Sequence, residues 1–268
     1  MRNFIFLFFI ALFTNLFAEK VNIQKVDPEK IVSRFPKGGS PLLKDLKPFV
    51  FKCAKGQSLP YLIYRPEDVA KKLPLVIFLH GIGEAGSDNM SQLKHAEPLS
   101  FINRKIQKQY PCYFIAPQHP SGLHWGTISI TNPSSSLKKL SELVQNITIT
   151  EKIDASRIYI TGLSSGGWGA FDAVTLYPDV YAAAIVVSSG ADPKLVVARG
   201  QARPIWFSCN SNDKGIYQAV TGSAKALAEM NSEVHISVAE NRGGHSAWQW
   251  AFFDQAMIKW LFAQRIVR

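Results

Sequence analysis

The chain has 268 residues, of which 47% are hydrophobic and 19% are charged, and its formal net charge at pH 7 is +10. It is long enough for one large domain and too apolar to be intrinsically disordered. Because the lysine and arginine residues are scattered, they indicate a solvated basic surface, and we expect no nucleic-acid partner.

The first twenty residues, MRNFIFLFFIALFTNLFAEK, have the pattern of a secretory signal peptide. Arg2 gives a positive start, residues 4–13 are apolar, and the small Ala18 precedes the polar Glu19. A polar pair ends the apolar run well short of the twenty or so residues that a membrane span needs. We therefore expect residues 1–18 to be removed on export to a periplasm or the exterior, leaving no stable membrane anchor.

After the signal peptide, residues 19–46 are interpreted as a loose leader, and the domain proper is expected over 47–268. Eight apolar runs of strand length follow in chain order: 48–53, 60–65, 73–80, 112–117, 157–162, 182–187, 203–209 and 233–240. Apolar residues at helical spacing lie between or after the later runs: 135–147, the segment that follows Ser164, 217–230 and 247–264.

Two leading strands followed by strand and helix in alternation predict a mostly parallel sheet with an antiparallel start and helices on both faces. This order resembles the α/β-hydrolase fold. In such a sheet, functional residues gather on the loops that follow the carboxyl ends of the strands.

Three cysteines, Cys53, Cys112 and Cys209, cannot all pair within one chain. Each lies in or beside an expected strand and none has metal-ligand spacing, so we expect buried free thiols. We expect no metal and no organic cofactor.

The stretch TGLSSGGWGA contains G-x-S-x-G, formed by Gly162, Ser164 and Gly166. It falls where an expected strand must turn sharply into a helix, the place where α/β-hydrolases carry a nucleophilic serine. Glycines allow the close backbone packing of such a turn. We interpret Ser164 as the nucleophile and the N–H of Ser165, at the helix start, as one oxyanion donor.

The segment IYITGLSSGGWGAFDAVTLYPDVYAAAIVVSSGAD resembles the nucleophile region of secreted esterases related to feruloyl esterases, acetyl-xylan esterases and polyhydroxybutyrate depolymerases, and of the broader dienelactone-hydrolase-like group. PLVIFLHGIGEAGSDN resembles a second block of these enzymes. The resemblance spans about residues 50–264, and it implies a serine hydrolase of the α/β-hydrolase fold.

The HGIG stretch, residues 80–83, follows the third expected strand, where this fold places its other oxyanion donor. By the resemblance, that donor is the N–H of Ile82, with Gly81 as the competing choice. His80 precedes the nucleophile, so we interpret it as a structural residue at the strand end, and Glu84 as a residue that holds the loop.

A serine hydroxyl needs a general base, and histidine is the natural one near neutral pH. His245 lies after the last expected strand, in NRGGHSAW directly before the final helix, where this fold carries its base. His235 sits within an expected strand and is interpreted as a packing residue. The other histidines precede the nucleophile.

The acid is expected on the loop after the strand at 203–209, which offers Asp213 in NSNDKG. Related enzymes often have a His-Gly pair a few residues before this aspartate, whereas this chain has asparagines and a serine there. Asp213 could instead cap a polar turn. In that case Asp192, after another strand, is the reserve.

Trp125 and Trp168 could line a substrate cleft, and each could equally be a packing residue. These parts predict a secreted serine hydrolase that cleaves carboxylic esters through an acyl-enzyme intermediate, acting on small or polymer-borne esters. Two alternatives stay open: a serine peptidase similar to prolyl oligopeptidases, and a non-catalytic secreted binding module on a hydrolase fold.

Overall fold

The structure is a computed structural model that describes residues 21–32, 40–67, 69–240 and 243–267. The expected signal peptide, residues 1–18, lies outside this part of the chain. No helix among the described residues combines the length and the apolarity that crossing a membrane requires.

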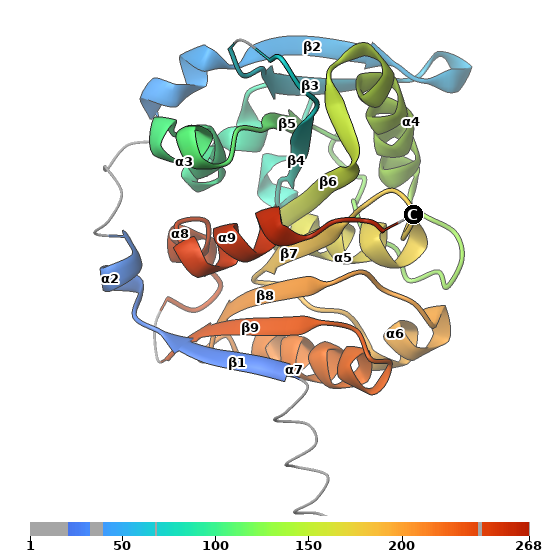
Figure 1. The fold of residues 1–268 in the computed structure, drawn as a ribbon. Helices are drawn as coiled ribbons and strands as arrows, with labels where there is room; N and C mark the ends of the chain where they lie inside the picture. Colours follow the sequence, from blue (N-terminus) through green and yellow to red (C-terminus); the bar gives the residue numbers. More distant parts are fainter. Residues whose placement is uncertain (1–20, 33–39, 68, 241–242, 268) are drawn as a thin grey trace, which may run out of the picture.

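A single sheet runs through the described part of the chain, with strand order β1-β9-β8-β7-β6-β4-β5-β3-β2 (Figure 1). Strands β2 and β3 pair antiparallel with each other, and β3 pairs antiparallel with β5, while the other neighbours are parallel. The mostly parallel sheet with an antiparallel start is therefore confirmed. The strands are β1 (Val21–Val26), β2 (Lys47–Lys52), β3 (Ser58–Tyr64), β4 (Leu73–Leu79), β5 (Tyr113–Pro117), β6 (Ile153–Leu163), β7 (Ala183–Val187), β8 (Ile205–Asn210) and β9 (Val234–Ala239).

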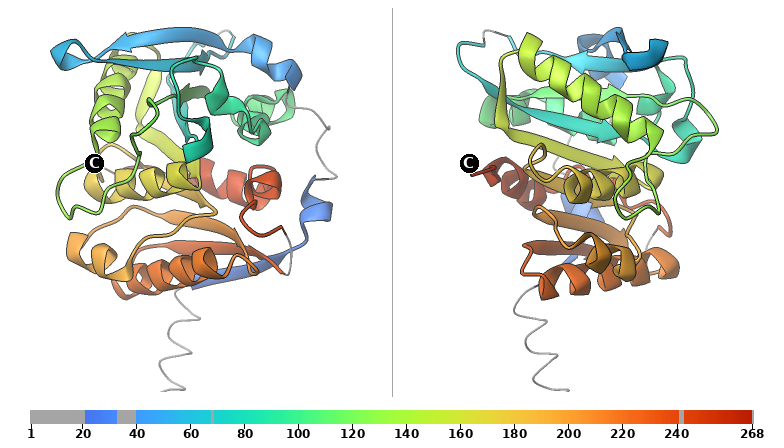
Figure 2. Two further views of the ribbon diagram at one scale, coloured as in Figure 1. Left: turned by 180° about the vertical axis from the view of Figure 1, so that it is seen from behind. Right: turned by 90° about the vertical axis from the view of Figure 1, so that its right-hand side faces the viewer.

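Helices cover both faces of the sheet (Figures 1 and 2). Alternate side chains of the central strands build one core on each face: Leu75 and Ile77 of β4 belong to one core, and Val76 and Phe78 belong to the other. The first core includes residues of α4 (Ser135–Thr150), α5 (Ser165–Leu176), α6 (Pro193–Arg199) and α7 (Lys214–Glu229). The second includes residues of α3 (Arg104–Gln109), α8 (Trp248–Ala251) and α9 (Gln255–Ala263).

Short elements connect these layers. The helix α2 (Pro28–Val32) lies beside α8. In the described ranges, 3₁₀ helices occupy the connections: η1 (Ser40–Asp45), η2 (Ala54–Gly56), η3 (Ile82–Glu84), η4 (Ser91–Leu93) and η5 (Glu97–Ile102). Of these, η3 directly follows β4 and belongs to the candidate site.

The segment that we interpreted as a loose leader contributes an edge strand. Residues 21–26 form β1, which pairs in parallel with β9 from Val21 opposite Val234 to Val26 opposite Ala239. Val21 is buried, and Gln24 donates a hydrogen bond to Ser237 on the neighbouring strand at 2.6 Å. Nothing in the local sequence signals this strand strongly, because its order comes from pairing with residues more than 200 positions away.

The C-terminal region also differs from the expected single helix over 247–264. It forms two helices, α8 and α9, with a break between Ala251 and Gln255. Asp254 caps the second helix, since its carboxylate accepts hydrogen bonds from the N–H groups of Ala256 and Met257. Apolar spacing continues through the break, which is why the periodicity alone predicts one helix.

Candidate active site

Ser164 lies at a sharp turn between β6 and α5. Its φ of 53° and ψ of −120° are unusual for a residue with a side chain. Glycines make room for the turn: a Cβ atom on Gly162 would lie 2.2 Å from the carbonyl oxygen of Gly166, and one on Gly166 would lie 2.0 Å from that of Leu79. The Ser164 side chain makes no capping hydrogen bond to α5, so its hydroxyl is available to another partner.

That partner is His245, which the fold brings to Ser164 from 81 residues further along the chain. Its Nε2 lies 2.9 Å from Ser164 Oγ, and its Nδ1 lies 2.7 Å from Asp213 Oδ2. Because a carboxylate only accepts hydrogen bonds, the proton lies on Nδ1, and Nε2 is left to accept from the serine hydroxyl. The three side chains form the hydrogen-bonded series that a serine hydrolase needs.

The geometry also separates the two aspartates considered for the acid. Asp213 precedes α7 at the capping position, yet its side chain makes no capping hydrogen bond and is turned to His245 instead. Asp192 does cap its helix, α6, by accepting from the N–H of Lys194 at 2.9 Å. Asp192 therefore caps a helix, whereas Asp213, for which a capping role was the alternative, does not.

The two expected oxyanion donors lie at the starts of neighbouring helices. Ile82 is the first residue of η3 and Ser165 is the first residue of α5, so neither N–H has an acceptor within its helix. The loop before Ile82 is close to the serine, since a Cβ atom on Gly81 would lie 3.7 Å from Ser164 Cβ. The Gly81 backbone, which precedes Ile82, thus lies near Ser164.

His80 fixes the peptide that carries the Ile82 N–H. The carbonyl oxygen of Gly81 lies 2.6 Å from His80 Nδ1 and also accepts from the N–H of Glu84. In a trans peptide the C=O and N–H point in opposite directions, so these bonds aim the Ile82 N–H away from His80. Burial lowers the pKa of His80 to about 3, which keeps its ring neutral. This agrees with a structural role.

Of the two roles that the sequence left open for Trp125, the structure shows packing and not the cleft wall. It is fully buried, its ring packs against His80 and His119, and its Cβ lies where a side chain on Gly169 would go. Trp125 belongs to the core that includes residues of α5. Trp168 is half-buried on α5, and its ring lies over Gly126, on which a Cβ atom would come within 2.4 Å of Trp168 Cδ2. Its place in a cleft stays a prediction.

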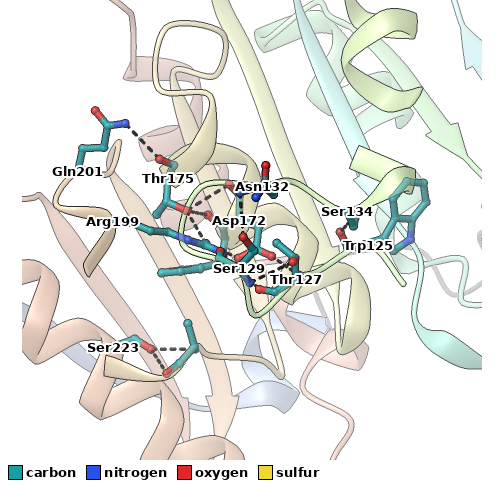
Figure 3. A network of polar contacts seen from close by, with 12 residues as sticks. Trp125, Thr127, Ser129, Asn132, Ser134, Asp172, Thr175, Arg199, Gln201 and Ser223 are labelled. Atoms are coloured by element: carbon teal, nitrogen blue, oxygen red, sulfur yellow. Dashed lines mark hydrogen bonds and ion pairs between the residues drawn. The ribbon is translucent and has the colours of Figure 1, made fainter. Parts of the chain in front are cut away.

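The loop that follows Trp125 is fastened to α5 by a buried ion pair (Figure 3). Asp172 Oδ2 accepts from the N–H of Thr127 at 2.6 Å, and Arg199 Nη1 lies 2.5 Å from Asp172 Oδ1. Arg199 Nη2 donates to the carbonyl oxygen of Ser129 at 2.9 Å. Both charged side chains are almost inaccessible to solvent, so the pair holds the loop, α5 and α6 together.

Trp248 lies next to His245 and His95 lies next to Trp248, and neither residue was expected at the site. The Trp248 ring lies edge-on to His245, with 5.6 Å between centroids, and His95 lies 5.1 Å from Trp248. His95 Nε2 is 3.6 Å from Glu84 Oε1 on the oxyanion loop. The position of Trp248, three residues after the expected base, was a usable signal, whereas nothing local marks His95.

Within the described residues, no cluster of histidine, cysteine, aspartate or glutamate could hold a metal ion. The three cysteines are free and buried, as expected.

Curated relatives of the chain include a depolymerase and two esterases. It is 26% identical to a poly(3-hydroxyalkanoate) depolymerase C of Paucimonas lemoignei over 47% of this chain and 30% of the relative. It is 25% identical to a probable acetylxylan esterase A of Aspergillus clavatus over 66% of this chain and 53% of the relative, and 25% identical to a feruloyl esterase B of Talaromyces funiculosus over 55% and 41%. The chain thus spans about a third to a half of their lengths.

Among solved structures, a thermostable esterase superposes with a TM-score of 0.78 at 31% identity, over 84% of this chain and 64% of the esterase. No family model matches the chain. The resemblance to feruloyl, acetyl-xylan and polyester-cleaving enzymes that the sequence motifs indicated is confirmed by these relatives. The chain therefore has the α/β-hydrolase fold and is related to esterases that share it.

Proposed function

We propose that the chain hydrolyses carboxylic esters with Ser164 as nucleophile, His245 as general base and Asp213 as the acid that orients the base. The observation that carries the proposal is the pair of hydrogen bonds made by His245, 2.9 Å to Ser164 and 2.7 Å to Asp213. The esterase relatives support the same reaction class.

In the first half of the reaction, Ser164 Oγ attacks the carbonyl carbon of the ester while His245 Nε2 takes the hydroxyl proton. The N–H groups of Ile82 and Ser165 donate to the oxyanion that develops, and Asp213 stabilises the charged imidazole. The tetrahedral intermediate then expels the alcohol, which receives its proton from His245. An acyl group stays bonded to Ser164.

In the second half, a water molecule attacks the acyl carbonyl as His245 removes its proton. The same two N–H groups hold the second oxyanion, and its collapse breaks the bond to Ser164 Oγ. His245 returns the proton to the serine, and the carboxylic acid leaves.

The proposal includes export, with cleavage after Ala18, because the apolar start and small residue have the form of a secretory signal. The mass of the mature protein recovered outside the cytoplasm tests this step. A first residue at Glu19 is expected, and an intact Met1 in exported protein contradicts it.

The ester reaction is tested by turnover of 4-nitrophenyl acetate, a feruloyl ester, short polyester oligomers and a peptide series. We expect ester turnover without peptide turnover, and Ser164→Ala should abolish turnover and labelling by a fluorophosphonate, since loss of such a nucleophile costs about 10⁶-fold in a well-studied serine hydrolase. Ser141→Ala, on α4, is the matched control and should keep both.

Each alternative predicts a different result in the same assays. Peptide turnover exceeding ester turnover indicates the peptidase. No turnover and no fluorophosphonate labelling in the parent protein indicates the non-catalytic binding module. Ester turnover that survives Ser164→Ala within a few-fold contradicts the assignment of the nucleophile.

A further inference from the structure

The base His245 gets little help from packing in keeping its place. Its side chain is 43% exposed, and it stands on a loop that enters through two residues of positive φ, Gly243 at 67° and Gly244 at 50°. Apart from the bonds to Ser164 and Asp213, its ring has the edge-on contact with Trp248. Its position must therefore depend on how the backbone before it is held.

Two asparagine side chains hold that backbone at Gly244, the residue immediately before the base. Asn210 Nδ2 donates to the carbonyl oxygen of Gly244 at 2.8 Å, and Asn212 Oδ1 accepts from the N–H of Gly244 at 3.1 Å. Both polar groups of this one residue are thus bonded to the loop that carries the acid.

The orientation of the Asn210 amide is fixed by its second partner. Its Oδ1 accepts from Trp250 Nε1 at 2.9 Å, and an indole N–H can only donate. The NH₂ group must then face the Gly244 carbonyl. Asn210 is 2% exposed, and a carboxylate or an apolar group in its place would remove the bond that ties the Gly244 carbonyl to β8. That carbonyl would keep its bond from the N–H of Ser246, at 2.9 Å.

The same asparagines flank the acid. The N–H of Asp213 bonds to the carbonyl oxygen of Asn210 at 3.2 Å, and Asn210 is the last residue of β8. On the far side of the base, the N–H of Ala247 bonds to the Ser188 hydroxyl at 3.0 Å. The acid loop and the base loop are therefore one hydrogen-bonded unit anchored at the ends of β7 and β8.

We propose that Asn210 and Asn212 are positioning residues that hold His245 at its distance from Asp213 and Ser164 by clamping Gly244 from both sides. This rests on the proposed function, in which His245 is the base. It assigns a role to the part of the chain that departs from the His-Gly pattern of related enzymes: the two amides fasten the base loop to the acid loop.

The two asparagines offer a matched test, because the same exchange has opposite consequences at the two positions. At 210 the amide must donate, and Asn210→Asp replaces the donor by an acceptor. At 212 the amide accepts, and Asn212→Asp keeps the acceptor, while Asn212→Ala removes it. Both aspartate variants add a negative charge within three residues of Asp213, at a buried position for 210 and at an exposed position for 212.

The variants are assayed at pH 8.5, where an introduced carboxyl is ionised. We expect Asn210→Asp to lower kcat at least about tenfold, equivalent to about 1.4 kcal/mol, with KM within about threefold of the parent. Asn212→Asp should lower kcat less than Asn212→Ala does. Trp250→Phe removes the bond from the indole N–H to Asn210 Oδ1 but keeps the amide donor to Gly244. It serves as the control for lost stability. If the two variants lose the same melting temperature, Trp250→Phe should lower kcat less than Asn210→Asp does.

A second readout does not require turnover. The proton between His245 Nδ1 and Asp213 should give a low-field NMR resonance that is lost in His245→Ala, weakened in Asn210→Asp and retained in Asn212→Asp. Equal kcat values for the two aspartate variants, or an unchanged resonance in Asn210→Asp, would overturn the proposal. Absence of ester turnover in the parent protein defeats the proposed function instead, and the resonance still tests the positioning.

Discussion

Asp213→Asn separates an acid that orients the base from an aspartate that caps a turn. The carboxylate oxygen lies 2.7 Å from His245 Nδ1 and accepts its proton. An asparagine in the same place can turn its NH₂ toward Nδ1, which stabilises the tautomer with the proton on Nε2. That proton would then face Ser164 Oγ at 2.9 Å, and the imidazole could no longer accept from the serine.

The expected loss in kcat is about 10⁴-fold, the size of the same exchange in a serine protease of another fold, and it corresponds to about 5.5 kcal/mol of barrier. Little stability should be lost. The Asp213 side chain makes no capping bond to α7, and the backbone bonds from Asp213 N to Asn210 O and from Tyr217 N to Asp213 O remain in the variant. We expect the melting temperature to change by less than about 2 °C.

The assay compares kcat on 4-nitrophenyl acetate and the melting temperature of Asp213→Asn with those of Asp192→Asn. Asp192 occupies the equivalent capping position of α6 and does bond to its helix. Asparagine caps about as well as aspartate, so this control should match the parent in both measurements. A rate for Asp213→Asn within about threefold of the parent, about 0.7 kcal/mol of barrier, would refute the assignment.

Two further predictions concern stability. Burial lowers the pKa of His80 to about 3. Below about pH 6.5 the unfolded chain therefore binds a proton at this residue that the folded chain does not. As the pH drops from 6 to 4, His80 should lower the free energy of unfolding, measured by urea titration, by about 1.4 kcal/mol per pH unit. His80→Gln should remove that part of the slope, and identical slopes contradict the reasoning. Gly166→Ala should cost about 3 kcal/mol or more, because its Cβ would lie 2.0 Å from the backbone oxygen of Leu79. Gly215→Ala in α7, where a Cβ meets nothing within 4 Å, should instead stabilise by about 1 kcal/mol, and a loss at Gly215 equal to that at Gly166 would show that packing is not the cause.

The sequence by itself determined the class of fold and the positions of the serine and the histidine. Strands of the central sheet are continuous apolar runs because they are buried on both faces, as the seven buried residues of β4 are. The turn at Ser164 needs glycines at short, fixed spacings because backbone atoms approach there closely. Both signals are local, so the chain carries them in short stretches that can be read without knowing what lies opposite.

Tertiary structure alone decided the features whose cause lies far along the chain. The edge strand β1 exists through pairing with β9, and the choice between Asp213 and Asp192 depends on which carboxylate faces His245. Trp125 is a core residue. The sequence could not decide this, because a tryptophan in a loop has the same local pattern whether its side chain points inward or outward. The clamp on Gly244 also depends on residues far along the chain. Nothing in the local sequence distinguishes Asn210 from other asparagines. Its partner Gly244 is 34 residues away and is brought beside it by the parallel pairing of β8 with β9.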